Sequence, residues 1–135
     1  MSFPGPRRFN SVEEALEFLE SEDLCVVEGS TLWEQHIEIW QCNEHVLTLG
    51  PIAYVVFSRD ETYSIVMNIH YFGVRRDWRG KGVGEALNWV LKDYLMEMPM
   101  PPTAIWTNTT SFGVIRLRSK VFGVPHEVDN GTRLL

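Results

Sequence analysis

The chain has 135 residues, of which 44% are hydrophobic and 22% charged, and its net charge is −6. This composition excludes a disordered or collagen-like chain, and the negative charge argues against general nucleic-acid binding. No apolar run reaches the roughly 18 residues of a membrane span, and Met1–Arg8 lacks the apolar stretch of a signal peptide. We therefore expect one domain over residues 1–135, located in the cytoplasm and not at a membrane.

The two cysteines, Cys25 and Cys42, are too few for a disulfide scaffold and do not have the spacing of metal ligands. They predict two buried free thiols, and no metal site is expected.

The charge is uneven along the chain. Residues 1–60 hold three basic and eleven acidic residues, a net charge of −8, whereas residues 61–135 hold nine basic and seven acidic residues, a net charge of +2. This division fits two ligands of opposite charge, or an acidic surface that is simply solvated.

The first half of the chain predicts two helices and a β meander. Ser11 and Glu14 form a capping box at the start of one helix, and Leu24–Val27 is a short strand candidate. A second capping box at Thr31–Glu34 predicts another helix. Its apolar face would hold Leu32, Trp33, His36, Ile37 and Trp40. Residues 51–58 and 63–74 are rich in β-branched and aromatic side chains and predict the strands of the meander.

The second half predicts alternating strands and helices. A polar, glycine-rich loop over residues 75–84 precedes a helix over residues 85–98, whose apolar stripe ends at three prolines. A strand at Ala104–Thr107, a helix at Ser111–Phe122 capped by Gly123, and one short strand would follow. This order predicts the α/β class, with a sheet packed by helices.

The glycine-rich loop has the features of a site for a phosphate group. Gly80, Gly82 and Gly84 let backbone amides approach an anion without interference from Cβ atoms. The N terminus of the following helix adds N–H groups and the positive end of its dipole. Four basic side chains add formal charge: Arg75, Arg76, Arg79 and Lys81. The alternative is a plain loop whose glycines serve close packing.

Two common phosphate loops do not fit this sequence. A Walker loop needs four residues between its first glycine and a Gly-Lys pair, and Gly73 is too far from Gly80 and Lys81 for that. A Rossmann dinucleotide loop needs its third glycine after two intervening residues, whereas only Val83 separates Gly82 from Gly84.

Val74 followed by Arg79-Gly80-Lys81-Gly82-Val83-Gly84 resembles the acyl-CoA signature of the GNAT-type N-acetyltransferase superfamily, Arg/Gln-x-x-Gly-x-Gly/Ala. Trp78 matches the aromatic residue before the arginine. The motif match covers residues 67–98, and the order of the elements extends the resemblance over most of the chain. The resemblance implies the acyl-CoA N-acyltransferase fold with a shortened C terminus: a mixed, mostly antiparallel sheet, flanked by helices and splayed beside the strand that ends at Val74.

The resemblance also implies that acetyl-CoA is the acyl donor. Its pantetheine arm would bind the strand end at Phe72, Gly73 and Val74, and Asn108 is a further candidate at the end of the later strand. Its diphosphate would bind the turn, at Arg79, Gly80, Lys81, Gly82, Val83 and Gly84.

In this family the acceptor amine attacks the thioester directly, which calls for a base, an oxyanion donor and help for the leaving thiolate. The amide of Phe72 fits the oxyanion donor by position. His70 is the candidate base, because its distance of four residues from Val74 predicts the same strand face; the alternative is a histidine with purely structural hydrogen bonds. Asn68 has the same parity and could hold a water.

Two departures from the family pattern concern the leaving group and the acceptor. The pattern near Leu-Tyr-x-x-x-Gly-Phe supplies a tyrosine as general acid, but the residue four before Gly123 is Ser119, whose hydroxyl is a poor acid. Ser119 is the third catalytic candidate, as a group that orients a water or bonds the sulfur. The short C terminus leaves the acceptor side open, or completed by a second copy of the chain in a homodimer.

The charge division then indicates a cationic acceptor. The basic half would attract the anionic donor, and the acidic helices, with Glu34 and His36 on the second, would border the acceptor unless His36 is core packing. We expect an N-acetyltransferase acting on a small amine, a lysine or a protein N-terminus. The alternatives are a non-catalytic CoA-binding or degenerate acetyltransferase fold that acts through a partner protein, and a nucleotide enzyme with the same loop.

Overall fold

The computed structural model describes residues 6–42, 50–107, 111–123, 127–128 and 132–134. In this part of the chain a helix, α1 (Val12–Ser21), precedes four strands, β1 (Leu24–Ser30), β2 (Gln35–Gln41), β3 (Ala53–Arg59) and β4 (Val66–Val74). A short 3-10 helix, η1 (Arg76–Trp78), leads to α2 (Val83–Met96). The elements that follow are β5 (Ala104–Thr107), α3 (Phe112–Phe122), β6 (Glu127–Val128) and β7 (Thr132–Leu134).

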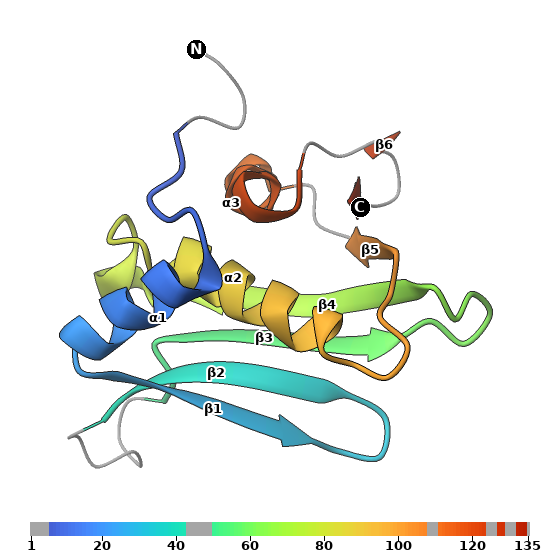
Figure 1. The fold of residues 1–135 in the computed structure, drawn as a ribbon, viewed down its shortest axis with the longest axis horizontal. Coiled ribbons are helices and arrows are strands. Elements are labelled where there is room, and N and C mark those ends of the chain that lie inside the picture. The colour runs from blue at the N-terminus through green and yellow to red at the C-terminus, as the bar shows by residue number, and fades with distance from the viewer. Residues whose placement is uncertain (1–5, 43–49, 108–110, 124–126, 129–131, 135) are drawn as a thin grey trace.

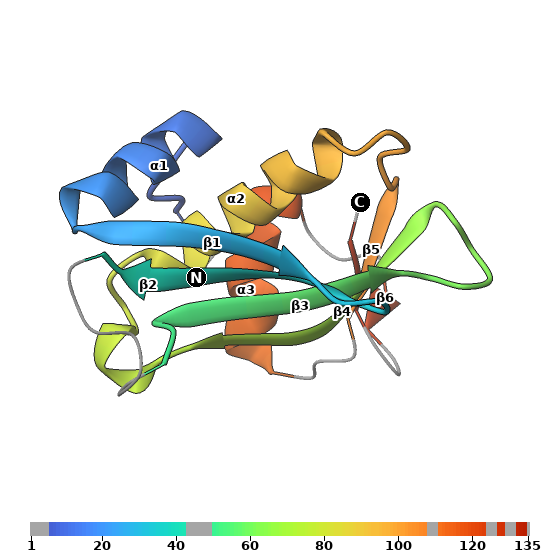
Figure 2. The same cartoon turned by 90° about the horizontal axis from the view of Figure 1, so that it is seen from below.

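The described strands form one mixed sheet in the order β1-β2-β3-β4-β5-β7-β6. Neighbouring strands are antiparallel except β4 and β5, which run parallel. The helices gather on one face of β1 to β4 (Figure 1), and the view from below shows these strands in front of α2 and α3 (Figure 2). The predicted α/β class with a mostly antiparallel sheet is therefore confirmed.

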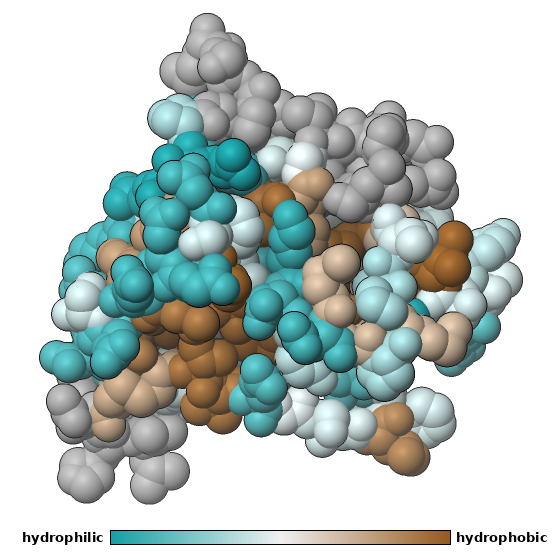
Figure 3. Space-filling view, in the orientation of Figure 1, coloured by the Kyte–Doolittle hydropathy of each residue, from teal (hydrophilic) through white to brown (hydrophobic). Residues whose placement is uncertain are grey.

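The core lies between α2 and the inner face of β2, β3 and β4. The apolar stripe of α2 is buried against the strands, and each of its larger side chains contributes roughly 1.5–3 kcal/mol by leaving water. The strands match it with Ile37, Ile39, Val55, Phe57, Met67 and Ile69. α1 adds Ala15 and Leu19, and its exposed glutamates contribute to the hydrophilic surface at the left of Figure 3. Among the described helices, none combines the length and apolarity needed to cross a membrane.

The helix predicted from Thr31–Glu34 is wrong, because this segment is the turn of a β hairpin. The Thr31 hydroxyl accepts hydrogen bonds from the backbone N–H groups of Trp33 and Glu34, at 3.3 and 3.1 Å, as it would at a helix N terminus. Here the turn joins β1 to β2, with Ser30 opposite Gln35. Beyond the turn the buried positions, Ile37 and Ile39, alternate with period two and not with the period of a helix.

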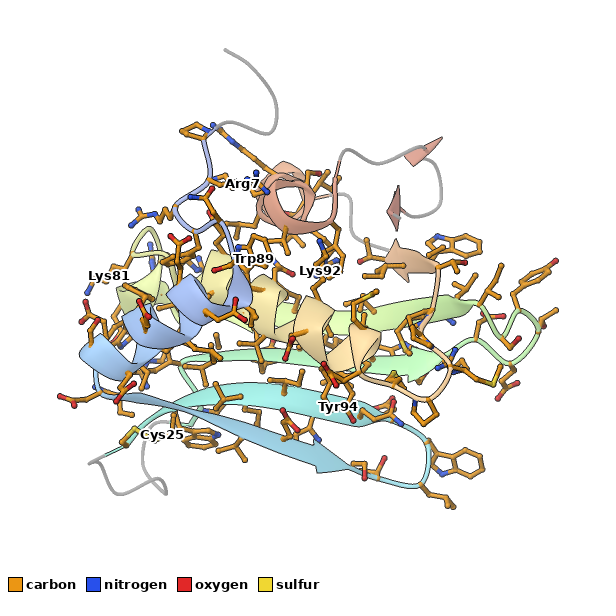
Figure 4. The ribbon with its side chains drawn as sticks, viewed as in Figure 1. Arg7, Cys25, Lys81, Trp89, Lys92 and Tyr94 are labelled. Atoms are coloured by element: carbon orange, nitrogen blue, oxygen red, sulfur yellow. A yellow bond between two sulfur atoms is a disulfide. The ribbon has the colours of Figure 1, made fainter. Side chains whose placement is uncertain are left out.

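The predicted free thiols are also wrong, because Cys25 and Cys42 form a disulfide. The antiparallel register brings the end of β2 beside the start of β1, pairing Leu24 with Gln41 and Cys25 with Trp40. The Cα atoms of the two cysteines are 5.4 Å apart as a result, within the range that a disulfide spans. Figure 4 shows Cys25 at the start of β1.

Within the described residues, β5 pairs with only the first part of β4. The parallel register pairs Val66–Ile69 with Ala104–Thr107 and stops there, so that residues 70–74 of β4 have no register partner on β5. On its other side β4 stays paired with β3 up to Val74. The splayed sheet was expected beside this part of β4, and residues 108–110, which follow β5, lie outside the described residues.

A bulge interrupts β4 directly after Ile69, the last β4 residue that pairs with the described part of β5. Phe57 of β3 lies opposite Ile69, but the next β3 partner, Val56, lies opposite Tyr71, so His70 is the extra residue. His70 and Tyr71 are both exposed, whereas the next residue, Phe72, packs against the core. A bulge shifts the alternation of strand faces by one residue, and this shift matters for the candidate base.

Candidate functional site

A cavity of about 550 Å³ lies where the unpaired end of β4, the glycine-rich turn, the start of α2 and helix α3 meet. Seven of the ten residues predicted to bind the cofactor line it: Phe72, Gly73, Val74, Arg79, Gly80, Gly82 and Gly84. These residues come from the end of a strand and from the turn that follows it. The sequence shows only that the two segments are consecutive, and the structure shows that they line one cavity.

Two glycines of the turn have different physical roles. Gly82 precedes the first residue of α2 with φ +97°, a left-handed conformation that side chains rarely adopt. A Cβ atom on Gly84 would lie 3.0 Å from Leu117 Cδ1 of α3 and 3.3 Å from Val74 Cγ2 of β4. Gly82 thus lets the chain turn into α2, and Gly84 lets α3 and β4 approach α2 closely.

The unpaired end of β4 directs backbone polar groups away from β3. The N–H of Arg75 donates to the carbonyl of Ile52, 2.6 Å away, which continues the β3–β4 ladder. Since hydrogen-bonded and non-bonded positions alternate in an antiparallel pair, the N–H and C=O groups of Phe72 and Val74 face the open side. Arg79 Nε donates to the Val74 carbonyl at 2.9 Å on that side and ties the turn to the strand.

The segment before α1 contributes a basic side chain that the sequence analysis missed. Arg8 lines the cavity, and its guanidinium donates to the Gly80 carbonyl at 2.8 Å. The backbone N–H groups of Arg8 and Phe9 both donate to the Glu85 carboxylate at 2.9 Å. Glu85 is buried in the first turn of α2, and Lys120 of α3 lies 3.9 Å from it. No local pattern signals these contacts, because their partners are more than 70 residues apart.

The other predicted cofactor residues lie around this cavity or outside the described chain. Lys81 lies beside the turn (Figure 4), where its amine is 4.9 Å from the centre of the Trp78 ring. Val83 is buried in the core and does not line the cavity. Asn108 lies outside the described residues.

The candidate base lies beside the cavity and not in its lining. The bulge places His70 on the exposed side, so the expectation that His70 and Val74 share a face is wrong. His70 Nε2 and Ser58 Oγ are 2.6 Å apart. Asn68 donates from Nδ2 to Asp60 at 2.8 Å and does not line the cavity either. His70 is nevertheless the next residue after Ile69, the last β4 residue that pairs with β5.

Ser119, the candidate for assisting the thiolate, is engaged with its own helix. Its side chain is buried, and its hydroxyl donates to the Ile115 carbonyl at 2.7 Å. The side chain therefore turns back along α3.

His36, expected on a helix beside the acceptor, is instead on β2. A Cβ atom on Gly29 would lie 2.5 Å from its Nε2, so the imidazole occupies the space that Gly29 leaves on β1. Its nearest carboxylate is Glu38, 3.9 Å from Nε2. This arrangement is packing between two strands.

Residues 11–123 match the model of the acetyltransferase (GNAT) family, and the chain therefore belongs to this family. The match covers the described helices and strands from α1 to α3. A search of functionally curated proteins finds no relative with significant sequence similarity.

Three solved structures share the fold at low sequence identity. A proposed GNAT acetyltransferase from Desulfovibrio desulfuricans has a TM-score of 0.53 and 10% identity, over 76% of this chain and 66% of the other. An acetyltransferase from Thermus thermophilus has a TM-score of 0.50 and 10% identity, over 93% and 73%. Nourseothricin acetyltransferase has a TM-score of 0.51 and 12% identity, over 83% and 81%. The chain thus spans about two thirds of the first of these proteins.

Proposed function

We propose that this chain transfers an acetyl group from acetyl-CoA to a primary amine by direct attack of the amine on the thioester. The acceptor classes are a small amine, a lysine side chain or a protein N-terminus. The observation that carries the proposal is the cavity that joins the unpaired end of β4 to the glycine-rich turn, in a chain of the GNAT family.

The residues around the cavity suit the chemistry of acyl-CoA. The N–H groups at the start of α2 have no side-chain cap from Gly82 and favour an anion such as the diphosphate. Arg8, Arg79 and Lys120 line the cavity and supply positive charge. The outward-facing C=O of Phe72 and N–H of Val74 would hydrogen-bond an amide-bearing chain such as the pantetheine arm, while Arg79 holds the Val74 carbonyl.

The same elements suit acyl transfer. The Phe72 N–H would polarise the thioester carbonyl. His70 would accept the ammonium proton, directly or through a water, from its position directly after the last β4 residue that pairs with the described part of β5. Its Nε2 lies 2.6 Å from Ser58 Oγ, a contact that orients the ring, and Nδ1 would be the nitrogen that takes the proton.

Thermal unfolding with added ligands tests the donor. At about 100 times its Kd, acetyl-CoA stabilises the folded chain by about 2.7 kcal/mol, which raises the Tm by several degrees. ATP and NAD at the same concentration should leave the Tm unchanged. A shift with ATP or NAD but none with acetyl-CoA would identify a nucleotide enzyme and contradict the proposal.

A matched pair of glycine variants tests the place of binding. An alanine at Gly82 meets the left-handed backbone and Arg8 Cδ at 3.1 Å, whereas Gly50 has φ +72° and open space around it. Gly82→Ala should weaken CoA binding by about tenfold or more, and Gly50→Ala should retain it at a similar cost in backbone strain, roughly 1 kcal/mol. Equal CoA affinity of the two variants in calorimetry would show that the glycine-rich turn does not bind the diphosphate.

A non-catalytic role through a protein partner is favoured by one observation. Leu32 and Trp33 at the tip of the β1–β2 hairpin are 86% and 77% exposed, and large exposed apolar side chains mark contact sites. Thiol release from acetyl-CoA with a panel of amines separates the two functions. Release that depends on an amine supports the enzyme, and CoA binding without any release supports the partner-binding role.

A further inference from the structure

Helix α3 places a buried cation behind the wall of the cavity. Arg118 is 0% exposed, and its guanidinium carbon lies 5.0 Å from the centre of the Phe72 ring. Phe72 lines the cavity from β4. Val114, one helical turn before Arg118 and thus on the same face of α3, lines the cavity as well. The guanidinium therefore lies behind Phe72, the residue whose N–H the proposed function places at the thioester.

This guanidinium has no counter-charge in the described part of the chain. None of its three nitrogens has a hydrogen-bond partner there. Glu85, a carboxylate of the adjacent helix, is bound by the amides of Arg8 and Phe9. The cation of Lys92 on α2 donates to the Val121 carbonyl at 3.3 Å.

Burial lowers the pKa of Arg118 to about 10, so the side chain is still cationic at neutral pH. A buried charge without a partner costs stability, and an anion that reaches it recovers part of that cost. A fixed positive charge next to a substrate cavity stabilises an anion that forms in the cavity.

We propose that Arg118 stabilises the CoA thiolate as it leaves the acyl carbon, in place of a general acid. This inference rests on the proposed function. The amine nitrogen forms the new bond to the carbonyl carbon, the C–S bond breaks, and its electron pair goes to sulfur. The ammonium proton passes to the base, and the thiolate leaves unprotonated in the cavity, within the electric field of the guanidinium behind Phe72.

The other residue of α3 that was considered for stabilising the leaving thiolate is Ser119. Its hydroxyl proton is already donated to the Ile115 carbonyl. A cation is sufficient for the task because a thiolate is only a moderate base; the thiol of cysteine, for comparison, has a pKa of about 8.5. Nearby positive charge lowers the pKa of a thiol and makes its thiolate a better leaving group.

The thiol pKa of bound CoA tests the inference directly, by titration of the ultraviolet absorbance of the thiolate in the complex. In the wild-type complex it should lie at least about one unit below that of free CoA, a tenfold larger ratio of thiolate to thiol. Arg118→Lys should retain part of the shift, and Arg118→Met should abolish it. An unshifted thiol in the wild-type complex, or an Arg118→Met complex with the full shift, would overturn the inference.

Lys120→Met is the matched control on the same helix. It removes the same charge, but near Glu85 and the turn, so it should weaken CoA binding and leave the thiol pKa shift in place. A Lys120→Met complex that loses the shift as Arg118→Met does would mean that general positive charge, and not Arg118, acts on the sulfur.

The outcomes separate this inference from the proposed function. If CoA does not bind the wild-type chain, both fail. If CoA binds and its thiol is unshifted, only the role of Arg118 fails. Folding of Arg118→Met is not expected to limit the experiment, because an apolar side chain in place of a buried unpaired ion is neutral or stabilising; its Tm should equal or exceed that of the wild type.

Discussion

At the residue scale, the carboxylate of Glu85 connects the start of α2 to the segment before α1. It accepts two backbone N–H groups and lies in a buried position where those donors would otherwise be unpaired. Through this anchor Arg8 reaches the Gly80 carbonyl and contributes its charge to the cavity. The buried side chain of Glu85 thus stabilises the fold and also positions Arg8 at the candidate site.

Glu85→Gln should lower the free energy of unfolding by about 1–3 kcal/mol, because an uncharged amide binds the two N–H groups less strongly. Glu97→Gln, at the exposed C-terminal end of the same helix, should change it by less than about 0.5 kcal/mol. Urea unfolding of the two variants measures the difference. Equal losses would contradict the anchoring role of Glu85.

At the element scale, the disulfide and the hairpin turn fix the two strands farthest from the site. The disulfide joins Cys25 and Cys42, which are 17 positions apart in the sequence, and the loop that it closes contains the exposed Leu32 and Trp33. Thr31 closes the same hairpin at its other end.

Replacing both cysteines by serine should lower the free energy of unfolding by about 3 kcal/mol, because the unfolded chain loses a constraint on a loop of this length. Denaturant unfolding with and without a thiol reductant measures the effect. The reductant should destabilise the wild type by a similar amount and leave the double variant unchanged. A wild type indifferent to the reductant would argue against the disulfide.

The connection between β3 and β4 depends on Asp60. Its carboxylate accepts hydrogen bonds from Asn68 Nδ2 and from the backbone N–H groups of Tyr63 and Thr62. The bond from Asn68 and then those from the backbone lower the pKa of Asp60. A lowered folded-state pKa stabilises the loop above the unfolded value of about 4 and loses this effect as the pH falls through the folded value.

Asp60→Asn should therefore make the loop independent of pH in the acidic range. In the wild type, amide exchange at Thr62 and Tyr63, corrected for its intrinsic pH dependence, should accelerate only below about pH 4. The variant should show fast exchange at every pH. Glu61→Gln, the exposed neighbour, is the control, and a wild-type acceleration at higher pH would contradict the assignment.

At the scale of the whole molecule, the charge division of the sequence has a spatial counterpart. The exposed glutamates of α1 contribute to one hydrophilic surface (Figure 3), and basic side chains of three separate segments, Arg8, Arg79 and Lys120, line the cavity. The acidic part of the chain thus supplies one of the cations, because Arg8 precedes α1.

Affinity for CoA should consequently fall as ionic strength rises, since the exposed cations at the cavity are screened over about 10 Å at 0.1 M salt. Raising the salt from about 0.05 to 0.5 M should weaken binding severalfold. Calorimetry across this range measures it, with the Tm of the ligand-free protein as control. An affinity that does not change with salt would mean that the diphosphate does not bind among these cations.

Local sequence patterns determined much of this protein. The cap at Ser11, the apolar stripe of α2, the strand at Ala104–Thr107 and the glycine-rich turn before α2 were all predictable. Each depends on neighbours a few residues away, and so did the resemblance that led to the acetyltransferase family. The prediction failed at Thr31, because hydrogen bonds from backbone N–H groups to a threonine hydroxyl occur both at the start of a helix and in a hairpin turn. The local sequence therefore does not distinguish the two.

Tertiary structure alone decided the rest. The pairing of Cys25 with Cys42, the bulge that moves His70 off the cavity face, the contact of Arg8 with Gly80 and the burial of the Arg118 guanidinium against Phe72 all depend on strand register and helix packing. These are relations between residues distant in the chain. Their energies come from shared burial and from hydrogen bonds across elements, which no short stretch of sequence contains.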